Sequence, residues 1–242
     1  MSKAGFFFNT SSASFLVTAR HVLFKEKTDQ LIDVNAEIVS YAKDPADQTK
    51  NIFALDLAAL KKYGLIKRSA DHDVAVLRVG ATTKEDNRSL VKVSEGVSAI
   101  QNAKTGILGV GESTAKRFSE VLTGNQVFIF GYPMSLGLRT IPQIDYAKPL
   151  LRSGIVAGTN EKLKTIILDC AAYGGNSGGP VLEVEVVESG TKYRVIGVVS
   201  QFVPAVETWT NFPHGYVNTN VYNSGYTVAT PMDFVLDLVA QF

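Results

Sequence analysis

The sequence predicts an all-β protein. Short runs of β-branched and aromatic residues, bounded by Gly, Pro and Asn, recur along most of the chain and are typical of strands. Only residues 56–63 and 231–242 carry helix signals. The chain has 242 residues with 45% hydrophobic content. That size fits one domain built from two β-barrels as well as two small independent domains.

Three strands are expected near the N-terminus. Residues 5–8 and 15–18 should pair across a polar turn, which places His21 just past a strand end. Residues 33–41 alternate as a further strand.

A short helix is expected at residues 56–63. Asp56 is suited to cap its start, two leucines share one face, and Gly64 closes its end. We expect this inserted helix to pack beneath the strand that follows Asp73.

The second half contains further strand patterns. They fall at residues 124–133, 149–157, 164–169, 180–187 and 193–200. The first of these is a buried strand of β-branched and aromatic residues that stops at a Gly-Tyr-Pro sequence.

The remainder of the chain is predicted as a loop and a terminal helix. Residues 203–224 mix polar and aromatic residues and are expected to form a long surface loop. At residues 231–242 a capping pattern precedes an apolar stripe, with Thr230 as N-cap and Pro231 in the first helical position.

Residues 172–180, Ala-Tyr-Gly-Gly-Asn-Ser-Gly-Gly-Pro, crowd one serine between glycines. A serine hydroxyl becomes a strong nucleophile only beside a base that a third group orients. Glycine at position 175 opens backbone dihedrals that other residues avoid, so the N–H groups of Gly175 and Ser177 can converge on an oxyanion. Taken alone, such a stretch is more often a surface turn.

Three motifs together resemble the chymotrypsin-fold (trypsin-like) serine peptidases. Residues 169–180 are similar to the nucleophile loop of the HtrA-type branch without a gap. Thr-Ala-Arg-His-Val at residues 18–22 resembles the segment that supplies the base, and Asp-Val-Ala-Val-Leu at residues 73–77 resembles the strand that supplies the acid. The motifs occur in the family's order.

The resemblance implies an architecture and a chemistry. It implies two six-stranded-type antiparallel β-barrels in one peptidase domain, the first at about residues 1–112 and the second at about 120–230, followed by the helix at 231–242. We expect no PDZ module beside this peptidase domain.

The chemistry implied is that of a serine endopeptidase. Ser177 attacks the peptide carbonyl, His21 takes and returns the proton, and Asp73 orients the imidazole. The N–H groups of Gly175 and Ser177 form the oxyanion hole. The resemblance implies no cofactor and no metal.

Asp71, His72 and His214 are the other candidates for catalytic or metal-binding roles. In a strand Asp71 and Asp73 would share one side, so periodicity does not choose between them, whereas the family pattern selects Asp73. His72 and His214 are expected to be loop histidines, and the Asp-His-Asp run lacks the further spaced ligand of a metal site.

Gly-Asn-Ser-Gly-Gly at residues 175–179 also fits the Gly-x-Ser-x-Gly elbow of the α/β-hydrolases. That fold needs a helix after the serine, then an acid and a histidine. Residues 180–187 alternate like a strand instead, and the only acids between Ser177 and His214 are glutamates. The context therefore disfavours the elbow.

The resemblance also suggests a substrate preference. Ala171 falls at the base of the primary pocket, where no carboxylate would meet a basic side chain. Ser200, Gln201 and Phe202 are expected to line one wall, with Phe202 where a glycine often leaves the pocket open. A small or aliphatic P1 residue is therefore expected.

Charge and cysteine content limit the partners and the compartment. A formal net charge of +1 gives no electrostatic footprint for nucleic acid or a membrane surface. Cys170 is the only cysteine and is expected to be a small buried hydrophobe, so no intrachain disulfide forms. With no signal peptide and no apolar run of about 20 residues, the expected location is a reducing, bacterial cytoplasm.

The expected partner is therefore a protein or peptide substrate, while an activating partner and the oligomeric state stay open. An alternative function from another class is a latent or non-catalytic peptide-binding or scaffolding module that keeps the fold. Such a module would bind peptides without acylation.

Overall fold

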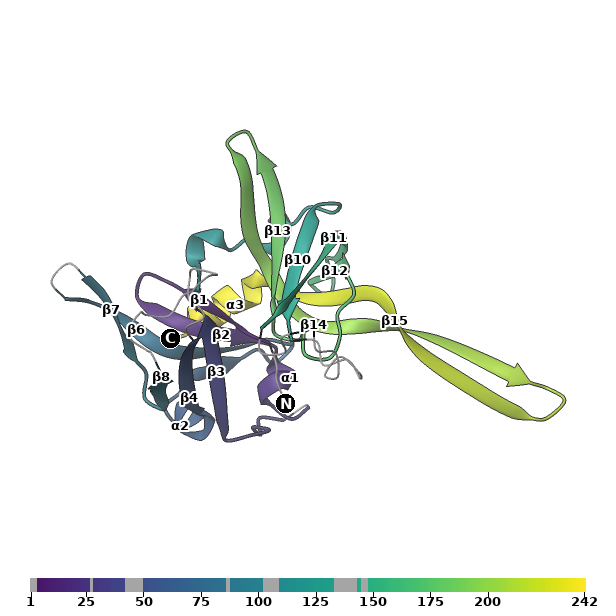
Figure 1. The fold of residues 1–242 in the computed structure, drawn as a ribbon, viewed down its shortest axis with the longest axis horizontal. Coiled ribbons are helices and arrows are strands. Elements are labelled where there is room, and N and C mark those ends of the chain that lie inside the picture. Colours follow the sequence, from purple (N-terminus) through teal and green to yellow (C-terminus); the bar gives the residue numbers. More distant parts are fainter. Residues whose placement is uncertain are drawn as a thin grey trace.

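The computed structural model describes residues 4–26, 28–41, 50–85, 88–101, 109–132, 143–144 and 148–242. Within these ranges the chain is mainly β-strand, in two β-rich halves (Figure 1), which confirms the predicted fold class. Parts of both expected barrels, among them Pro133 at the end of one predicted strand, lie outside the described residues.

The N-terminal half contains two sheets. The six-stranded sheet has the order β5-β6-β2-β1-β9, with β7 added on β6, and the second sheet has the order β3-β4-β8. The strands of the first sheet are β1 (Phe6–Asn9), β2 (Ala13–Thr18), β5 (Ile66–Arg68), β6 (Ala75–Glu85), β7 (Arg88–Val93) and β9 (Val110–Gly111). Those of the second sheet are β3 (Asn35–Tyr41), β4 (Lys50–Asp56) and β8 (Val97–Gln101).

Two short helices lie in this half, α1 (Arg20–Leu23) and α2 (Leu57–Lys62). Asp56 caps α2, because its carboxylate accepts the N–H of Ala59 at 2.8 Å. The buried leucines of α2 belong to one core cluster with residues of β6. The inserted helix and its packing beneath that strand are therefore as predicted.

The C-terminal half contains a closed antiparallel barrel with the order β10-β11-β12-β15-β14-β13. Its strands are β10 (Gln126–Gly131), β11 (Leu150–Asn160), β12 (Thr165–Asp169), β13 (Pro180–Val187), β14 (Gly190–Asn211) and β15 (Tyr216–Pro231). The barrel interior is apolar, and its fully buried residues include Val127, Ile129, Ile166, Leu168 and Ile196.

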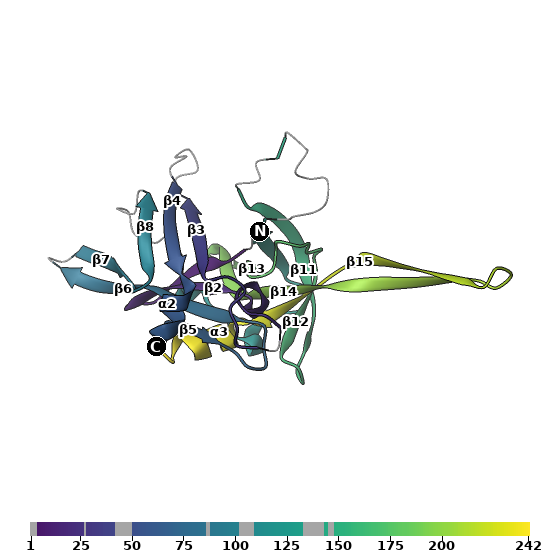
Figure 2. The same cartoon turned by 90° about the horizontal axis from the view of Figure 1, so that it is seen from below.

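The prediction of a loop at residues 203–224 was wrong. These residues form the outer parts of β14 and β15, which pair from Pro204 opposite Asn223 to Asn211 opposite Tyr216. This hairpin projects from the barrel in both views (Figures 1 and 2). The polar residues suggested a loop, but alternating Val, Thr, Trp and Tyr stabilise strands through cross-strand pairs.

The terminal helix α3 (Met232–Val239) begins later than predicted. Thr230 belongs to β15, where it lies opposite Val198, and Pro231 takes the N-cap position. Strand pairing therefore outweighs the capping preference of Thr230. The Asp233 carboxylate accepts the N–H of Phe118 at 2.7 Å instead of completing a capping box.

The two halves share one apolar core. A single cluster joins β1, β2 and β6 of the first half to β14 and to α3. Its members include Phe8, Val17, Val76, Val195, Val198, Met232 and Val235. Burying each such side chain stabilises the fold by about 1.5–3 kcal/mol, so this core sets how the two halves lie against each other.

A buried ion pair fixes the segment that connects the halves. Glu183 of β13 is fully buried and accepts from Lys116 Nζ at 2.7 Å and Asn125 Nδ2 at 2.7 Å. Burial acts to lower the pKa of Lys116, but its bonds to Glu183 and Glu185 outweigh burial and raise that pKa. Lys116 is therefore held as a cation against the Glu183 side chain.

Candidate active site

His21 and Asp73 are brought together by the pairing of β2 with β6. Thr18 lies opposite Ala75, so the residues just beyond the two strand ends meet. The N–H of His21 donates to Asp73 Oδ1 at 3.0 Å, and His21 Nδ1 lies 2.7 Å from Asp73 Oδ2. This double contact fixes the ring and directs Nε2 away from the acid.

Asp73 has a further partner. The Ser200 hydroxyl donates to Asp73 Oδ2 at 2.6 Å. Burial acts to raise the pKa of Asp73, but the hydrogen bonds from His21 and Ser200 outweigh burial, and the pKa lies below its usual value. Asp73 is therefore ionised at neutral pH. Asp71 is exposed and does not contact His21.

The loop that carries Ser177 packs directly on the segment before His21. Gly178 has φ +90°, and a Cβ there would lie 2.3 Å from both Ala4 O and Thr18 Oγ1. It would also lie 3.0 Å from the nitrogen of Ala19. Only glycine allows this approach, which brings the serine loop beside the turn that holds His21.

Backbone bonds attach the same loop to the second barrel. The N–H of Gly178 donates to Val199 O at 2.8 Å, and the N–H of Val199 donates to Gly179 O at 2.9 Å. Among the residues that the structure describes, no hydrogen bond joins the Ser177 hydroxyl to His21. The structure thus pairs His21 with Asp73 and packs the Ser177 loop on the segment before His21 without that bond.

The predicted oxyanion donors are oriented by their neighbours. Gly175 has φ +100°, and its carbonyl accepts the N–H of Tyr132 at 3.1 Å. The Asn176 side chain accepts the N–H of Tyr173 at 3.0 Å. Within the described part of the chain, the N–H groups of Gly175 and Ser177 donate to no partner, so both are free to bind an incoming oxygen.

The residues predicted to form the pocket lie on two segments on either side of β15, the chain after β12 and strand β14. Ala171 is half-buried, and the residues on either side of it are tied to β15 through Thr227, which donates to Cys170 O at 2.6 Å and accepts from Ala172 N at 3.1 Å. Gln201 and Phe202 are exposed on β14, whereas the Ser200 side chain is buried against Asp73.

Cys170 directly precedes Ala171 in the chain, and its side chain is 4% exposed. Burial raises the pKa of its thiol. The thiol is therefore held as a neutral apolar group, as the sequence analysis expected.

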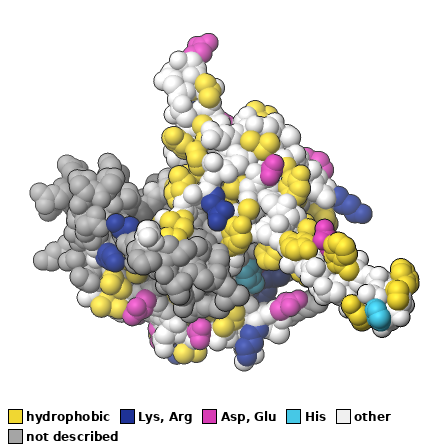
Figure 3. Space-filling model, turned by 45° about the vertical axis from the view of Figure 1, so that its right-hand side comes forward, with side chains coloured by type: hydrophobic (Ala, Val, Ile, Leu, Met, Phe, Trp, Pro, Cys, Tyr) yellow, Lys and Arg dark blue, Asp and Glu magenta, His cyan; other side chains and the backbone are white. Residues whose placement is uncertain are grey.

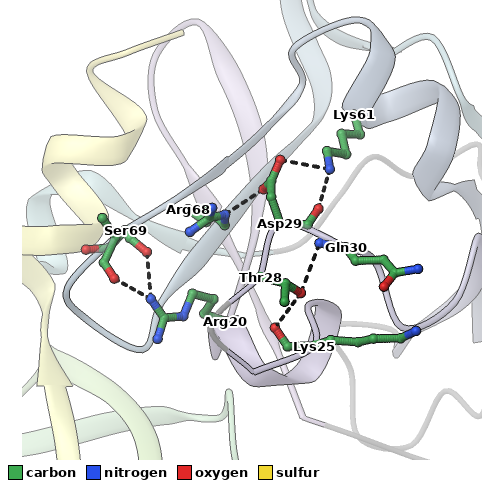
Figure 4. Close-up of polar contacts among 9 residues, drawn as sticks. Arg20, Lys25, Thr28, Asp29, Gln30, Lys61, Arg68 and Ser69 are labelled. Atoms are coloured by element: carbon green, nitrogen blue, oxygen red, sulfur yellow. Dashed lines mark hydrogen bonds and ion pairs between the residues drawn. The ribbon is translucent and has the colours of Figure 1, made fainter.

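Two positioning contacts were missed from the sequence. Arg20 donates to the carbonyls of Ser69 at 3.2 Å and Ala70 at 2.5 Å, which joins the His21 turn to the loop before Asp73 (Figure 4). His72 stacks on Phe234 of α3 with ring centroids 3.4 Å apart. An isolated Arg or His gives no sequence signal for such contacts.

Figure 4 also shows an exposed ion cluster beside Arg20. Asp29 contacts Arg68 Nε at 2.7 Å and Lys61 Nζ at 2.9 Å. Hydrogen bonds from Lys61 and Arg68 lower the pKa of Asp29. The cluster connects the loop after α1 to α2 and β5.

The described residues contain no group of three or more His, Cys, Asp or Glu side chains placed to hold a metal ion. In the same part of the chain, no helix has the length and apolar character needed to cross a membrane.

Comparisons with known structures find loose similarity to HtrA-type peptidases. HtrA-type protease AlgW with a tripeptide is 16% identical, with a TM-score of 0.48, over 99% of this chain and 55% of that chain. AlgW with a decapeptide is 16% identical, with a TM-score of 0.47, over 94% and 47%. A serine endoprotease from Yersinia pestis is 11% identical, with a TM-score of 0.42, over 99% and 56%. The chain thus spans about half the length of these structures.

No curated protein matches the chain. The model of the trypsin-like peptidase domain matches residues 4–187, which is most of the sequence. The chain therefore belongs to the trypsin-like peptidase family.

Proposed function

We propose that this protein is a serine endopeptidase in which Ser177 is the nucleophile, His21 the general base and Asp73 the orienting acid. The observation that carries the proposal is the double contact of Asp73 with His21, through Nδ1 at 2.7 Å and the backbone N–H at 3.0 Å. A carboxylate that holds a histidine at its ring Nδ1 and at its backbone N–H, beside a serine loop, fits acyl transfer.

In this mechanism each group has one task. With Nδ1–H held by Asp73, His21 Nε2 is free to accept the Ser177 proton as the hydroxyl attacks the peptide carbonyl. His21 then passes that proton to the leaving amine, and a water molecule hydrolyses the acyl-enzyme with the same base. The ionised Asp73 stabilises the imidazolium formed in each step.

The oxyanion is assigned to the N–H groups of Gly175 and Ser177. Both are unpaired in the described part of the chain, and the Gly175 carbonyl is turned away to Tyr132. Loss of one such donor raises the barrier by about 3–4 kcal/mol.

We assign a small or aliphatic P1 preference to the segment around Ala171 and to the wall formed by Gln201 and Phe202. Ala171 places no charged group in the proposed P1 pocket. Phe202, which is 42% exposed, narrows the open side of that pocket. Ser200 contributes its backbone, because its hydroxyl is held by Asp73.

The expected substrate is a protein or peptide. A reducing compartment such as a bacterial cytoplasm is part of this proposal, and the presence of a single cysteine supports it.

A second candidate is a latent or purely peptide-binding form on the same fold. The missing hydrogen bond between the Ser177 hydroxyl and His21 favours it. In free enzymes catalytic hydrogen bonds are often long and shorten only when substrate binds, so this observation weighs less than the assembled His21–Asp73 pair.

Cleavage of a peptide library tests the proposal. Wild-type protein should cleave after small or aliphatic residues, and Ser177→Ala should reduce turnover by several orders of magnitude. Ser153→Ala, at an exposed serine of β11, is the matched control and should keep full turnover. Peptide binding without cleavage by the wild type would favour the second candidate.

A further inference from the structure

The hairpin at residues 203–224 forms a projecting arm with two unlike faces. Alternation along paired strands puts three directly opposite pairs on one side, Val206–Val221, Thr208–Thr219 and Thr210–Val217. We call these six residues the Val/Thr face. All six are exposed, and the valines are 59%, 63% and 62% exposed at positions 206, 221 and 217.

Two hydrogen bonds join side chains on the opposite face of the arm. Tyr222 donates to Glu207 at 3.0 Å, and Asn211 donates to the Tyr216 hydroxyl at 3.2 Å. Trp209 lies on this face opposite Asn218. The Val/Thr face has no such bonds between its side chains, so its exposed surface consists of methyl groups and hydroxyls. The opposite face is exposed as well, and it carries Trp209 and Glu207.

Isolated two-stranded hairpins are marginally stable in water, and contiguous exposed apolar patches mark interaction sites. The arm leaves the barrel as a bare two-stranded ribbon (Figure 2), and hydrophobic side chains lie along it in the space-filling view (Figure 3). A second layer packed on the Val/Thr face would stabilise the arm.

Charge favours a second copy of the chain as that layer. Residues 203–224 contain one glutamate, Glu207, and no Asp, Lys or Arg. Since Glu207 lies on the opposite face, two Val/Thr faces can meet without like charges between them. A twofold dimer needs such a self-complementary surface. The absence of Lys and Arg also gives the arm no attraction for anionic membranes.

The available area is sufficient for a reversible dimer. Each side chain of this size offers on the order of 100 Å², so the Val/Thr face offers roughly 600 Å². Two such faces bury about 1,200 Å², the lower limit for specific stable interfaces.

We propose that the arm is a dimerisation element, in which the Val/Thr faces of two copies of this chain pack against each other about a twofold axis. The interface is independent of catalysis. The expected dissociation constant is on the order of micromolar, the weak end of the range that standard-size interfaces span.

Sedimentation velocity over about 1–200 µM protein, which brackets that constant, tests the proposal. Val206→Lys with Val217→Lys places charge on the Val/Thr face at positions that do not pair with each other, and dimerisation should weaken at least tenfold. Asn218→Lys with Asn220→Lys adds the same charge to the opposite face and should leave dimerisation unchanged.

A second variant in which a Gly-Ser-Gly turn replaces residues 204–223 should be monomeric. Circular dichroism melting shows that each variant is folded. A monomeric wild type over the whole range would overturn the proposal, and so would equal association of wild type and Val206→Lys with Val217→Lys. Binding of the monomeric wild type to vesicles or to long peptides through this face would assign it to those partners instead.

Discussion

Replacing Gly178 by alanine should both destabilise the fold and displace Ser177. At φ +90° an L-residue is strained by about 1–2 kcal/mol. The new Cβ would also lie 2.3 Å from the backbone oxygen of Ala4, and overpacking of this kind costs about 1–3 kcal/mol. The free energy of unfolding should therefore fall by about 2–5 kcal/mol.

Gly124→Ala separates the two effects. Gly124 has φ +92°, but nothing lies within 4 Å of its added Cβ, so only the strain of about 1–2 kcal/mol applies. Urea unfolding of both variants measures the difference, which should be about 1–3 kcal/mol. Turnover of Gly178→Ala should drop about 100-fold, because a displacement near 1 Å misaligns the attack. Equal unfolding free energies and equal turnover in the two variants would refute the close packing of this loop on Ala4 and Thr18.

Three further substitutions test the buried polar contacts. Asp73→Asn should lower turnover by about 10⁴-fold. The pKa of Asp73 is depressed in the folded chain. Its contribution to stability is therefore fully present above the unfolded pKa of about 4 and is lost as pH falls through the lower, folded pKa. Acid titrations of unfolding in wild type and Asp73→Asn should converge only once the pH is below that folded pKa. Ser200→Ala removes a bond worth about 1.5–3 kcal/mol to a charged group, and it should raise the pKa of Asp73 and lower turnover about tenfold or more. Lys116→Met leaves Glu183 buried without its cation and should lower the free energy of unfolding in urea by about 3–5 kcal/mol. Lys164→Met, at an exposed pair, is the control and should lower it by less than about 1 kcal/mol. An equally small loss for Lys116→Met would contradict the buried ion pair.

The predictions that were confirmed depend on local patterns. The helix after Asp56 combines a cap, an apolar face and a closing glycine within a few residues, and all three features operate locally. Strand runs such as residues 126–131 are rich in β-branched and aromatic residues, and every second residue is buried, so their type is set by their own composition. The prediction of Asp73, and not Asp71, as the orienting acid rests on the family pattern, because both side chains would lie on the same side of a strand.

What could not be predicted depends on distant partners. The contact of Ser200 with Asp73 joins residues 127 positions apart. The full burial of Glu183 depends on Lys116 and Asn125, which reach it from the connecting segment. The arm was taken for a loop because its stability depends on pairing between two strands, which composition alone does not reveal.

Intact-mass labelling with a fluorophosphonate tests the central claim, that Ser177 is a nucleophile activated by His21. Wild-type protein should gain one adduct per chain, mapped to Ser177, while Ser177→Ala and His21→Ala should remain unlabelled over the same time. Labelling of Ser177→Ala to the same extent as wild type, or no labelling of the wild type, would contradict the proposed site.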